Sequence, residues 1–578
     1  MNLTSVLAAL ALLATPFIAH ADCQVTEFLD LPVTITNMHP LAEAQINGAP
    51  AKFVIDSGAS INGITPGAAK AFHLDLEPGP AASAEGIGGG VLLSLTTVKI
   101  FTLARYPFKN IPFLVGGSEV GDGAAGLLGQ ELLGVADIDY DFAAGMVRFI
   151  RPKDCGDQPL AYWLKPGQTF AELDVRSSDP DSKDIIGVAT VNGVRIKVLF
   201  DTGGGDSLLS LAAAKRAGAS LGDAGVVDGG AESGVGSRMI RTWIAPFKSF
   251  EIGGEQILNT RLRIGDWANK YRDNPDMILG DDFFLAHHVY VANSQHKVYF
   301  TYNGGPVFNL EVKGAAASDA PAPTTASAWA SLGAVALSRE TWSEAIADYG
   351  HAIELDPRTG DYYAQRGRAH AQASQPELAA KDFDRALELD PADVCTRLSR
   401  AQTRTEADDL TGARSDLTAV DGSMDKASDF RLELANAFDA AALPHEAIPS
   451  FNAWIAIHPD DSRMTYALAD RCWAKAMANE ALDTALGDCQ RSLRLAPGAG
   501  LALEARGIVF LREGAFDKAI ADETGVLAES PQCGWCLEAR GAARIGKGDA
   551  SGGKADLAAA AAINSRLPER AKAFGLQP

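Results

Sequence analysis

The sequence has 578 residues, too many for one hydrophobic core, and at roughly 150 residues per domain its length indicates several domains. With 47% hydrophobic and 21% charged residues, it can bury real cores, which excludes a wholly disordered chain. The formal net charge of −22 argues against nucleic acid as a partner, because so acidic a surface repels phosphate groups.

The first 21 residues predict export. An apolar run from Val6 to Ala19 leads into Ala19-His20-Ala21, a small-x-small sequence typical of a signal peptide cleavage site, although Met1 to Ser5 lacks the usual Lys or Arg. The run is shorter than the about 20 residues of a membrane-spanning helix, so we favour a cleaved signal peptide over 1–21 above the alternative, an uncleaved anchor. No later stretch is long and apolar enough to cross a bilayer, which predicts a soluble mature chain, periplasmic or secreted.

Two parts of the first half repeat each other. Residues 46–58 and 191–203 align without a gap at an offset of 201 − 56 = 145, and each ends in an apolar run followed by Asp, Ser or Thr, and Gly. A second element, Leu127-Leu128-Gly129, aligns with Ile278-Leu279-Gly280. The repetition indicates two lobes that descend from one unit.

Between these elements each copy has a glycine cluster flanked by β-prone runs, as at a hairpin tip. Short apolar runs separated by Gly, Pro and Asp recur in both copies, while helical periodicity is scarce. We therefore predict two mainly β lobes, 22–155 and 169–312, joined by a linker over 156–168. The predicted hairpin tips are Gly86, Ile87 and Gly88 in the first lobe, and Gly234, Val235 and Gly236 in the second.

The element containing Asp56 and its copy containing Asp201 resemble the active-site loop of aspartic proteases, in particular the retropepsin-like family. The resemblance covers roughly residues 30 to 310 and implies a mainly β bilobal module, a pseudo-dimer within one chain. It also implies that the two aspartates form a catalytic pair. Two adjacent carboxyl groups hold one proton between them, so that one activates water while the other donates to the peptide carbonyl.

The same resemblance assigns supporting roles to the neighbours of the aspartates. Gly58 and Gly203 would let the backbone turn tightly, and the hydroxyls of Ser57 and Thr202 would brace one loop against the other. The glycine hairpins would act as flaps that close over a peptide or protein substrate. This chemistry needs no cofactor or metal, and the ten histidines show no metal spacing.

After Val312 the composition changes, and an Ala- and Pro-rich linker is predicted over 313–325. The following segment resembles tetratricopeptide repeats, because prolines recur at the 34-residue period: 391 − 357 = 34 and 531 − 497 = 34. We predict an all-α solenoid of about seven repeats over 326–565, which binds a protein partner, and a tail over 566–578. The residues that match the repeat signature are Trp329, Leu332, Gly333, Ala345, Tyr349 and Pro357.

Seven cysteines are too few for a disulfide scaffold but suffice for local bridges in an oxidising compartment. In the resembled family the terminal strands of a lobe come together, which implies a bridge between Cys23 and Cys155. Cys472 and Cys489 fall on the two helices of one repeat and are candidates for a disulfide between these helices. Cys533-Gly534-Trp535-Cys536 has the C-x-x-C form of thiol oxidoreductases, but no strand precedes it, so we favour a local disulfide between Cys533 and Cys536, or plain packing, over a redox function.

Together these features predict an exported aspartic endopeptidase with a repeat array for protein interaction. One departure keeps an alternative open. The second copy continues with Gly204-Gly205 where the first has Ala59-Ser60, the usual run of the family. The alternative is a catalytically inactive, protease-like scaffold that binds peptides without cutting them.

Overall fold

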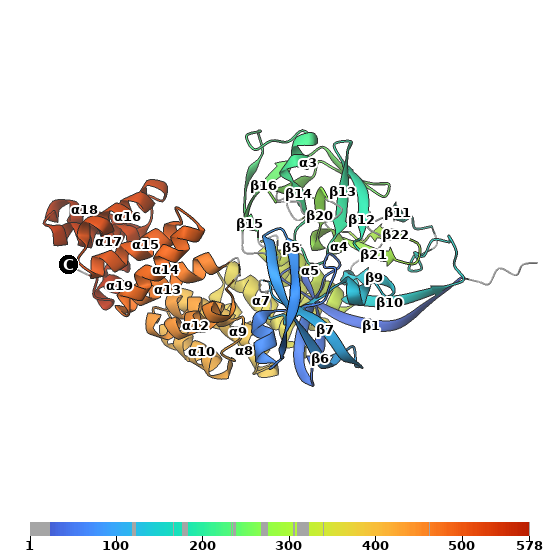
Figure 1. Cartoon of the computed structure of the whole chain (residues 1–578), viewed down its shortest axis with the longest axis horizontal. Coiled ribbons are helices and arrows are strands. Elements are labelled where there is room, and N and C mark those ends of the chain that lie inside the picture. The colour runs from blue at the N-terminus through green and yellow to red at the C-terminus, as the bar shows by residue number, and fades with distance from the viewer. Residues whose placement is uncertain are drawn as a thin grey trace, which may run out of the picture.

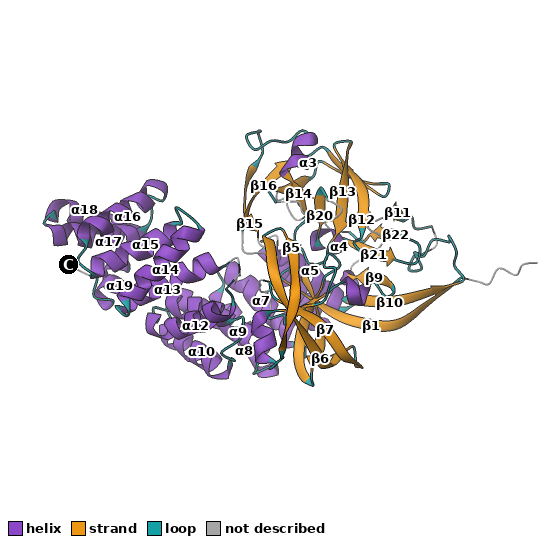
Figure 2. Ribbon diagram, viewed as in Figure 1, coloured by secondary structure: helices purple, strands orange, loops and turns teal. Residues whose placement is uncertain are grey.

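The computed structural model describes residues 23–117, 123–165, 167–175, 183–232, 234, 239–267, 275–304, 307–308, 323–338, 340–459, 461 and 463–576. The predicted signal peptide and most of the predicted linker 313–325 lie outside the described residues. Figure 2 shows strands gathered in one half of the molecule and a succession of helices in the other. The predicted fold class, a mainly β bilobal module followed by an all-α array, is confirmed.

The first lobe consists of strands with two short helices, listed here in chain order: β1 (Gln24–Thr36), β2 (His39–Ile46), β3 (Ala49–Ile55), β4 (Gly63–Ile64), α1 (Pro66–Ala71), β5 (Leu76–Gly86), β6 (Gly89–Leu103), β7 (Tyr106–Val115), β8 (Gly126–Leu128), α2 (Gln130–Leu133), β9 (Asp137–Asp141) and β10 (Met146–Lys153). A 3-10 helix, Phe142–Ala144, joins the last two strands. In the second half of β1 every second residue is apolar, and the structure explains this pattern. Leu29, Leu31, Val33 and Ile35 are buried, because residues two apart in a strand face the same side of the sheet.

The second lobe repeats this order with elements β11 (Ala171–Asp174), β12 (Ile186–Val191), β13 (Val194–Phe200), β14 (Leu208–Ser210), α3 (Leu211–Arg216), β15 (Val227–Glu232), β16 (Ile240–Pro246), β17 (Ser249–Ile252), β18 (Glu255–Leu258), β19 (Arg261–Gly265), β20 (Met277–Leu279), α4 (Asp281–Phe284), β21 (His287–Ala292) and β22 (Lys297–Tyr302). In each lobe a buried strand runs parallel to the apolar-apolar-Gly element, β3 beside β8 and β13 beside β20. The last three residues of each strand, 53–55 and 198–200, are all buried, which explains the short apolar run before each aspartate.

The lobes are joined by a sheet to which both contribute. Its strand order begins β11-β22-β21-β9-β10-β1, so three strands come from each lobe. In the central pair Asp139 lies opposite Tyr290, and 290 − 139 = 151 is also the offset between Gly129 and Gly280. Antiparallel pairing centred on equivalent residues gives the lobes an approximate two-fold relation within one chain. The largest hydrophobic cluster of the described residues contains side chains of both lobes.

The predicted linker between the lobes is packed against this sheet. Leu160 and Ala161 are buried in one cluster with Tyr290, and Trp163 stacks on His288 with ring centroids 4.3 Å apart. The segment therefore covers the sheet rather than spanning solvent.

The helical half forms an extended array that leads away from the β half (Figure 1). Seven helix pairs are followed by one short helix in the described residues: α5 (Ala326–Ser338), α6 (Trp342–Leu355), α7 (Gly360–Gln372), α8 (Pro376–Leu389), α9 (Val394–Glu406), α10 (Leu410–Ser423), α11 (Arg431–Ala440), α12 (Pro444–Ile457), α13 (Met464–Ala478), α14 (Leu482–Leu495), α15 (Gly500–Arg512), α16 (Phe516–Glu529), α17 (Gly534–Lys547), α18 (Ala550–Ile563) and α19 (Leu567–Ala573). None of the described helices is long and apolar enough to span a membrane.

The 34-residue period has a packing reason. Ala345, Ala379, Ala413 and Ala447 are spaced by 34 residues and all fully buried, since a small side chain lets the two helices of a pair approach closely. The segment predicted as a tail, 566–578, contains α19, whose Leu567 and Ala571 are buried against the array. This helix covers the end of the solenoid, as terminal caps do.

Among the described residues, hydrogen bonds attach the helical half to the β half at two places. Helix α5 packs on the first lobe, where Ser331 Oγ donates to Phe142 O at 2.8 Å and Ser327 Oγ donates to Ala144 O at 3.2 Å. Further along, the turn between α10 and α11 reaches the first lobe through Asp429, which accepts the hydroxyl of Thr65. Two separated contacts fix the array against that lobe.

Candidate active site

Asp56 and Asp201 each follow a buried strand and are held by the same contact. The Asp56 amide donates to Leu128 O, and the Asp201 amide donates to Leu279 O, each at 3.0 Å. The apolar-apolar-Gly element of each lobe therefore anchors the aspartate of that lobe. This accounts for the joint repetition of the two elements in the sequence.

The two loops are braced by reciprocal hydrogen bonds between Ser57 and Thr202. The Ser57 amide donates to Thr202 Oγ1, and the Thr202 amide donates to Ser57 Oγ, both at 3.0 Å. Each hydroxyl then donates to a strand carbonyl of the opposite lobe, Ser57 to Phe200 O at 2.9 Å and Thr202 to Ile55 O at 2.7 Å. Both side chains are fully buried, so these bonds are shielded from competition by water.

Gly58 and Gly203 leave room for the aspartate of the opposite loop. A Cβ at Gly58 would overlap the Asp201 carboxyl group, and a Cβ at Gly203 would overlap that of Asp56. The amides of Gly58 and Ala59 donate to Asp56 Oδ1 at 2.9 and 2.8 Å. The Gly203 amide donates to Asp201 Oδ1 at 2.9 Å. The glycines thus bring the two carboxyl groups together.

The pair is placed to share a proton. Burial raises the pKa of Asp56 well above its ordinary value, and the neighbouring Asp201 raises it further. Burial also raises the pKa of Asp201. The interaction between the two carboxyl groups raises the pKa of Asp56 and opposes the rise in the pKa of Asp201. The pair therefore provides one acid and one base over a common pH range.

A third carboxyl group, Asp281, lies close to the pair and was not singled out from the sequence. It is equivalent to Gln130 of the first lobe, since 281 − 130 = 151. Gln130 Nε2 donates to Ser57 O at 2.8 Å, whereas both carboxyl oxygens of Asp281 lack a hydrogen-bond partner among the described residues. Burial raises the pKa of Asp281 well above its ordinary value, and the charges of Asp201, Asp282 and Asp56 add to the effect.

His39 faces this third carboxyl group. Its Nδ1 lies 3.7 Å from Asp281 Oδ2, and burial lowers the pKa of His39. The two shifts run in opposite directions, and each favours the uncharged form of its group. The signal in the sequence was an aligned position that carries Gln in one copy and Asp in the other.

The predicted flap hairpins meet across the lobes. Ile87 and Gly88 form the turn between β5 and β6, directly after Gly86, and Ile87 packs against Leu208, Ile240, Trp267 and Ile278 of the second lobe. Gly234 lies beyond β15, and a Cβ there would approach Ile87 Cγ1 to 2.7 Å. Val235 and Gly236 lie outside the described residues. Figure 1 shows the β5 end of the first hairpin next to β15.

The second hairpin is tied to the aspartate loop by Arg263 of β19. Its guanidinium donates to Asp206 Oδ2 at 2.7 and 3.1 Å and lies 3.3 Å from Glu232 Oε1 at the end of β15. It also donates to Gly229 O on β15. One cation thus fixes strand β15 to the segment that follows Asp201.

The aspartyl protease family model matches the chain twice, over residues 42–132 and 188–283. Each match contains one of the paired aspartates and the apolar-apolar-Gly element that anchors it. The β half is aspartyl protease-like. Each lobe of this protease-like half corresponds to one match, as the repeated sequence elements predict. Among curated proteins, none matches the chain significantly.

Solved structures of repeat proteins are similar to the chain. The crystal structure of the APC/C hetero-tetramer Cut9-Hcn1 is 17% identical and covers 38% of this chain and 42% of that chain, with a TM-score of 0.32. YrrB, described as a TPR protein with an unusual peptide-binding site, is 18% identical over 33% of this chain and 97% of its own, with a TM-score of 0.28. A tetratricopeptide repeat protein from Parabacteroides merdae ATCC 43184 is 14% identical over 42% and 95%, with a TM-score of 0.34.

Proposed function

We propose that this chain is an exported aspartic endopeptidase whose helical array binds a protein partner or a polypeptide substrate. One observation carries the catalytic part: Asp56 and Asp201 lie close together across the two-fold relation of the lobes, each against the glycine of the opposite loop. The reciprocal Ser57 and Thr202 contacts hold the loops in register. A scaffold that only binds peptides has no need of two adjacent buried carboxyl groups, which are costly to bury together.

In the proposed reaction the ionised member of the pair accepts a proton from a water molecule, which attacks the peptide carbonyl carbon. The protonated member donates to the carbonyl oxygen. The two hairpins exclude solvent and offer backbone groups to an extended substrate. Because the Ile87 turn already contacts the second lobe, substrate entry requires the hairpins to separate.

The array offers a place for a partner close to the catalytic half. A cavity of about 370 Å³ is lined by aromatic and polar side chains of the first repeats, among them Trp342, Tyr349 and Arg368. Asn37, in the turn between β1 and β2, lines the same cavity, and His39 follows two residues later. A polypeptide bound in this cavity therefore lies beside the turn between β1 and β2. This turn is followed by His39, the residue that faces Asp281.

Export is proposed on the predicted signal peptide and on the cysteines. Three pairs have their sulfur atoms joined: Cys23 with Cys155, Cys472 with Cys489, and Cys533 with Cys536. Disulfides persist in oxidising compartments such as the periplasm, where the cytosolic thiol systems do not reduce them.

The test is incubation of the mature protein with a diverse peptide mixture, with and without a statine-type transition-state mimic, with cleavage sites read by mass spectrometry. We expect cleavage that the mimic blocks. Asp56→Asn and Asp201→Asn should each lower the rate by about 10²-fold or more, because the reaction needs both acid and base. The exposed Asp30→Asn is the matched control and should leave the rate unchanged.

The double variant separates one shared site from two. If both aspartates act on one water molecule, the double variant is no slower than the slower single variant. Rate losses that multiply would contradict a shared site. Peptides that bind to the wild type but are never cut would instead support the inactive scaffold.

A further inference from the structure

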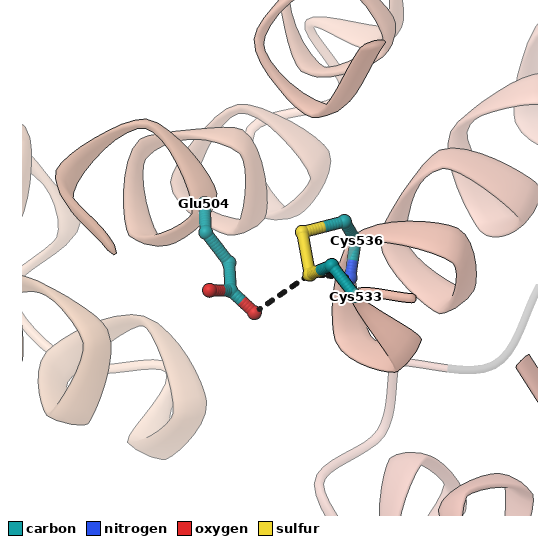
Figure 3. Close-up of side chains that lie close together, drawn as sticks. All are labelled: Glu504, Cys533 and Cys536. Carbon is teal, nitrogen blue, oxygen red and sulfur yellow. Dashed lines mark hydrogen bonds between the residues drawn. A yellow bond between two sulfur atoms is a disulfide. The ribbon is translucent and has the colours of Figure 1, made fainter. Parts of the chain in front are cut away.

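The Cys533–Cys536 disulfide lies at the start of a helix in the last repeat (Figure 3). Cys533 is the N-cap residue of α17, and its Sγ accepts a hydrogen bond from the Cys536 amide at 3.2 Å. Backbone amides and the positive end of a helix stabilise a thiolate at this position. When the bridge opens, the sulfur of Cys533 therefore sits where its anion is favoured.

The two sulfur atoms of this bridge differ in access. Cys536 is fully buried, while Cys533 is partly exposed. The other bridge of the array, between Cys472 and Cys489, has both residues fully buried in a hydrophobic cluster. A second molecule can therefore reach Cys533 but not the sulfurs of Cys472, Cys489 or Cys536.

A half-buried carboxyl group faces the bridge. Glu504, on α15 of the preceding repeat, points toward the disulfide and places Oε1 at 3.5 Å from Cys533 Sγ (Figure 3). Its carboxylate oxygen and the two sulfurs all lie within 4.8 Å of one another. Burial raises the pKa of Glu504 to about 7, so the group gains and loses a proton near neutral pH.

A second acidic side chain, Glu523, lies close to Glu504. Glu523 of α16 is fully buried, and neither of its carboxyl oxygens has a hydrogen-bond partner among the described residues. Burial raises the pKa of Glu523 well above its ordinary value, and Glu504 and Asp522 add to this, while Arg540 of α17 opposes it. No contact among these groups supplies Glu504 with a salt bridge, so its carboxyl is placed for proton exchange and not for ion pairing.

We propose that Cys533 and Cys536 form a thiol–disulfide exchange site, with Cys533 as the exchanging sulfur and Glu504 as the proton donor and acceptor. The co-reactant is a thiol, from a small molecule or from a cysteine of another polypeptide. The site is independent of the proposed proteolysis, since it lies in the last repeats of the array and uses none of the aspartate loops.

The exchange balances in two steps. An incoming thiolate attacks Cys533 Sγ, a mixed disulfide forms, and the bond to Cys536 breaks. Cys536 leaves as a thiolate and takes the proton of Glu504, because a buried anion is costly. A second thiol then gives its proton to the Glu504 carboxylate and attacks the outer sulfur of the mixed disulfide as a thiolate, which releases the disulfide of the two incoming thiols and the Cys533 thiolate. Two thiols are oxidised and the bridge is reduced, and the reverse direction oxidises a pair of thiols.

The test uses the intact oxidised chain and needs no variant for its first arm. The protein is incubated at pH 7 with reduced glutathione or with a synthetic peptide containing one cysteine, alkylated at intervals and mapped by mass spectrometry. We expect the Cys533–Cys536 bridge to open at least about tenfold faster than the buried Cys472–Cys489 bridge, with the mixed disulfide on Cys533. Glutathione and peptide rates distinguish the two sources of thiol.

Trp535 gives a second readout, because it lies between the two cysteines with its ring 5.6 Å from that of Trp473. Its fluorescence should change with the opening of this bridge. Equal opening rates for the two bridges, a mixed disulfide on Cys536, or no opening before the protein unfolds would each overturn the proposal.

Variants assign the roles. Cys536→Ala should trap a mixed disulfide on Cys533 with oxidised glutathione, while Cys533→Ala leaves only the buried Cys536, which should not react. Glu504→Gln should slow the opening by about 10²-fold, the low end of the effect of a positioned acid. Glu513→Gln, exposed and just beyond the end of the same helix, is the matched control and should leave the rate unchanged. A Glu504→Gln rate equal to that of wild type would remove the carboxyl from the mechanism.

Discussion

Thr65 donates its hydroxyl hydrogen to Asp429 at 2.7 Å, across 364 residues of sequence and from the first β lobe to the helical array. The same hydroxyl oxygen accepts the Ala68 amide at 3.0 Å and so caps α1. The other oxygen of Asp429 contacts His458 Nε2 at 2.5 Å. A Cβ at Gly67 would overlap the Asp429 carboxyl group, so the glycine admits this close approach. One carboxylate thus joins the start of α1 to the end of α12.

We expect Thr65→Val to weaken the attachment of the array. The equivalent residue of the second lobe, at 65 + 145 = 210, is Ser210, which caps α3 in the same way but is not bonded to the array. Ser210→Ala should cost about 1 kcal/mol for the lost cap. Thr65→Val should cost about 2–3 kcal/mol, because it also leaves a buried carboxylate oxygen without its donor.

Urea unfolding measures the free energies of unfolding of the two variants. Hydrogen exchange of residues 424–430 reports on the contact between Thr65 and Asp429 itself. Faster exchange in this turn for Thr65→Val, but not for Ser210→Ala, is the expected pattern. Equal losses of stability with unchanged exchange would mean that the contact with Asp429 adds nothing to the cap.

The reciprocal hydrogen bonds between Ser57 and Thr202 predict a larger loss of stability than that of Thr65→Val. Thr202→Val should lower stability by about 2–4 kcal/mol, because the Ser57 amide and the Ile55 carbonyl lose their partner in a buried site. The control is Thr190→Val, since the hydroxyl of Thr190 is buried and has no hydrogen-bond partner among the described residues. That variant should be neutral or slightly stabilising. Thermal melts of the two variants make the comparison, and similar midpoints would contradict the importance of the brace.

Asp281 predicts a pH dependence of stability whose sign follows from its raised pKa. Its pKa in the folded state lies above its ordinary value of 3.8, so the folded protein binds more protons than the unfolded chain between the two values. This contribution therefore destabilises the fold increasingly as pH rises through that window. Asp281→Asn removes the ionisable group at nearly constant shape and should be more stable than wild type at pH 7, with a difference that shrinks toward pH 4.

Melting midpoints of wild type and variant between pH 4 and pH 7 test this directly. The exposed Asp30→Asn serves as the control and should show no such trend. A variant less stable than wild type at pH 7 would show that Asp281 is ionised and paired with His39, which is the opposite of the arrangement described above.

The sequence predicts the pair of aspartates because their neighbours are repeated at a constant offset. Asp56 and Asp201 follow equivalent strands, and the two-fold relation of the lobes turns equal sequence positions into adjacent positions in space. Asp281 directly follows a repeated element but was not predicted, because the repeat does not show which polar side chains are buried, and His39 belongs to no repeated element. The alignment shows Asp opposite Gln130, but only the fold shows that this carboxyl is buried without a partner.

The contact that attaches the helical array to the first lobe could not be predicted from the sequence either. Thr65 and Asp429 belong to no motif, and the register of the repeats does not tell where the array turns back on the β half. The flap prediction shows an intermediate case. Glycine spacing marked the turn at Ile87 and Gly88, whereas the contact of Ile87 with the second lobe depends on the distance between the lobes.

The bridge between Cys23 and Cys155 closes a segment of 132 residues that contains the whole first lobe. In the chain-entropy model a loop of this length stabilises the folded state by about 5 kcal/mol, because the bridge restricts the unfolded chain. Cys23→Ala should therefore lower the free energy of unfolding of the β half by up to about that amount. Cys155→Ala should lower the free energy of unfolding by a similar amount. The double variant should be no less stable than the less stable of the two single variants, because the bridge can be lost only once. Urea unfolding under non-reducing conditions measures the three losses, with peptide mapping to show the bridge in wild type. Losses that add in the double variant would assign the stability to the packing of each cysteine rather than to the bridge.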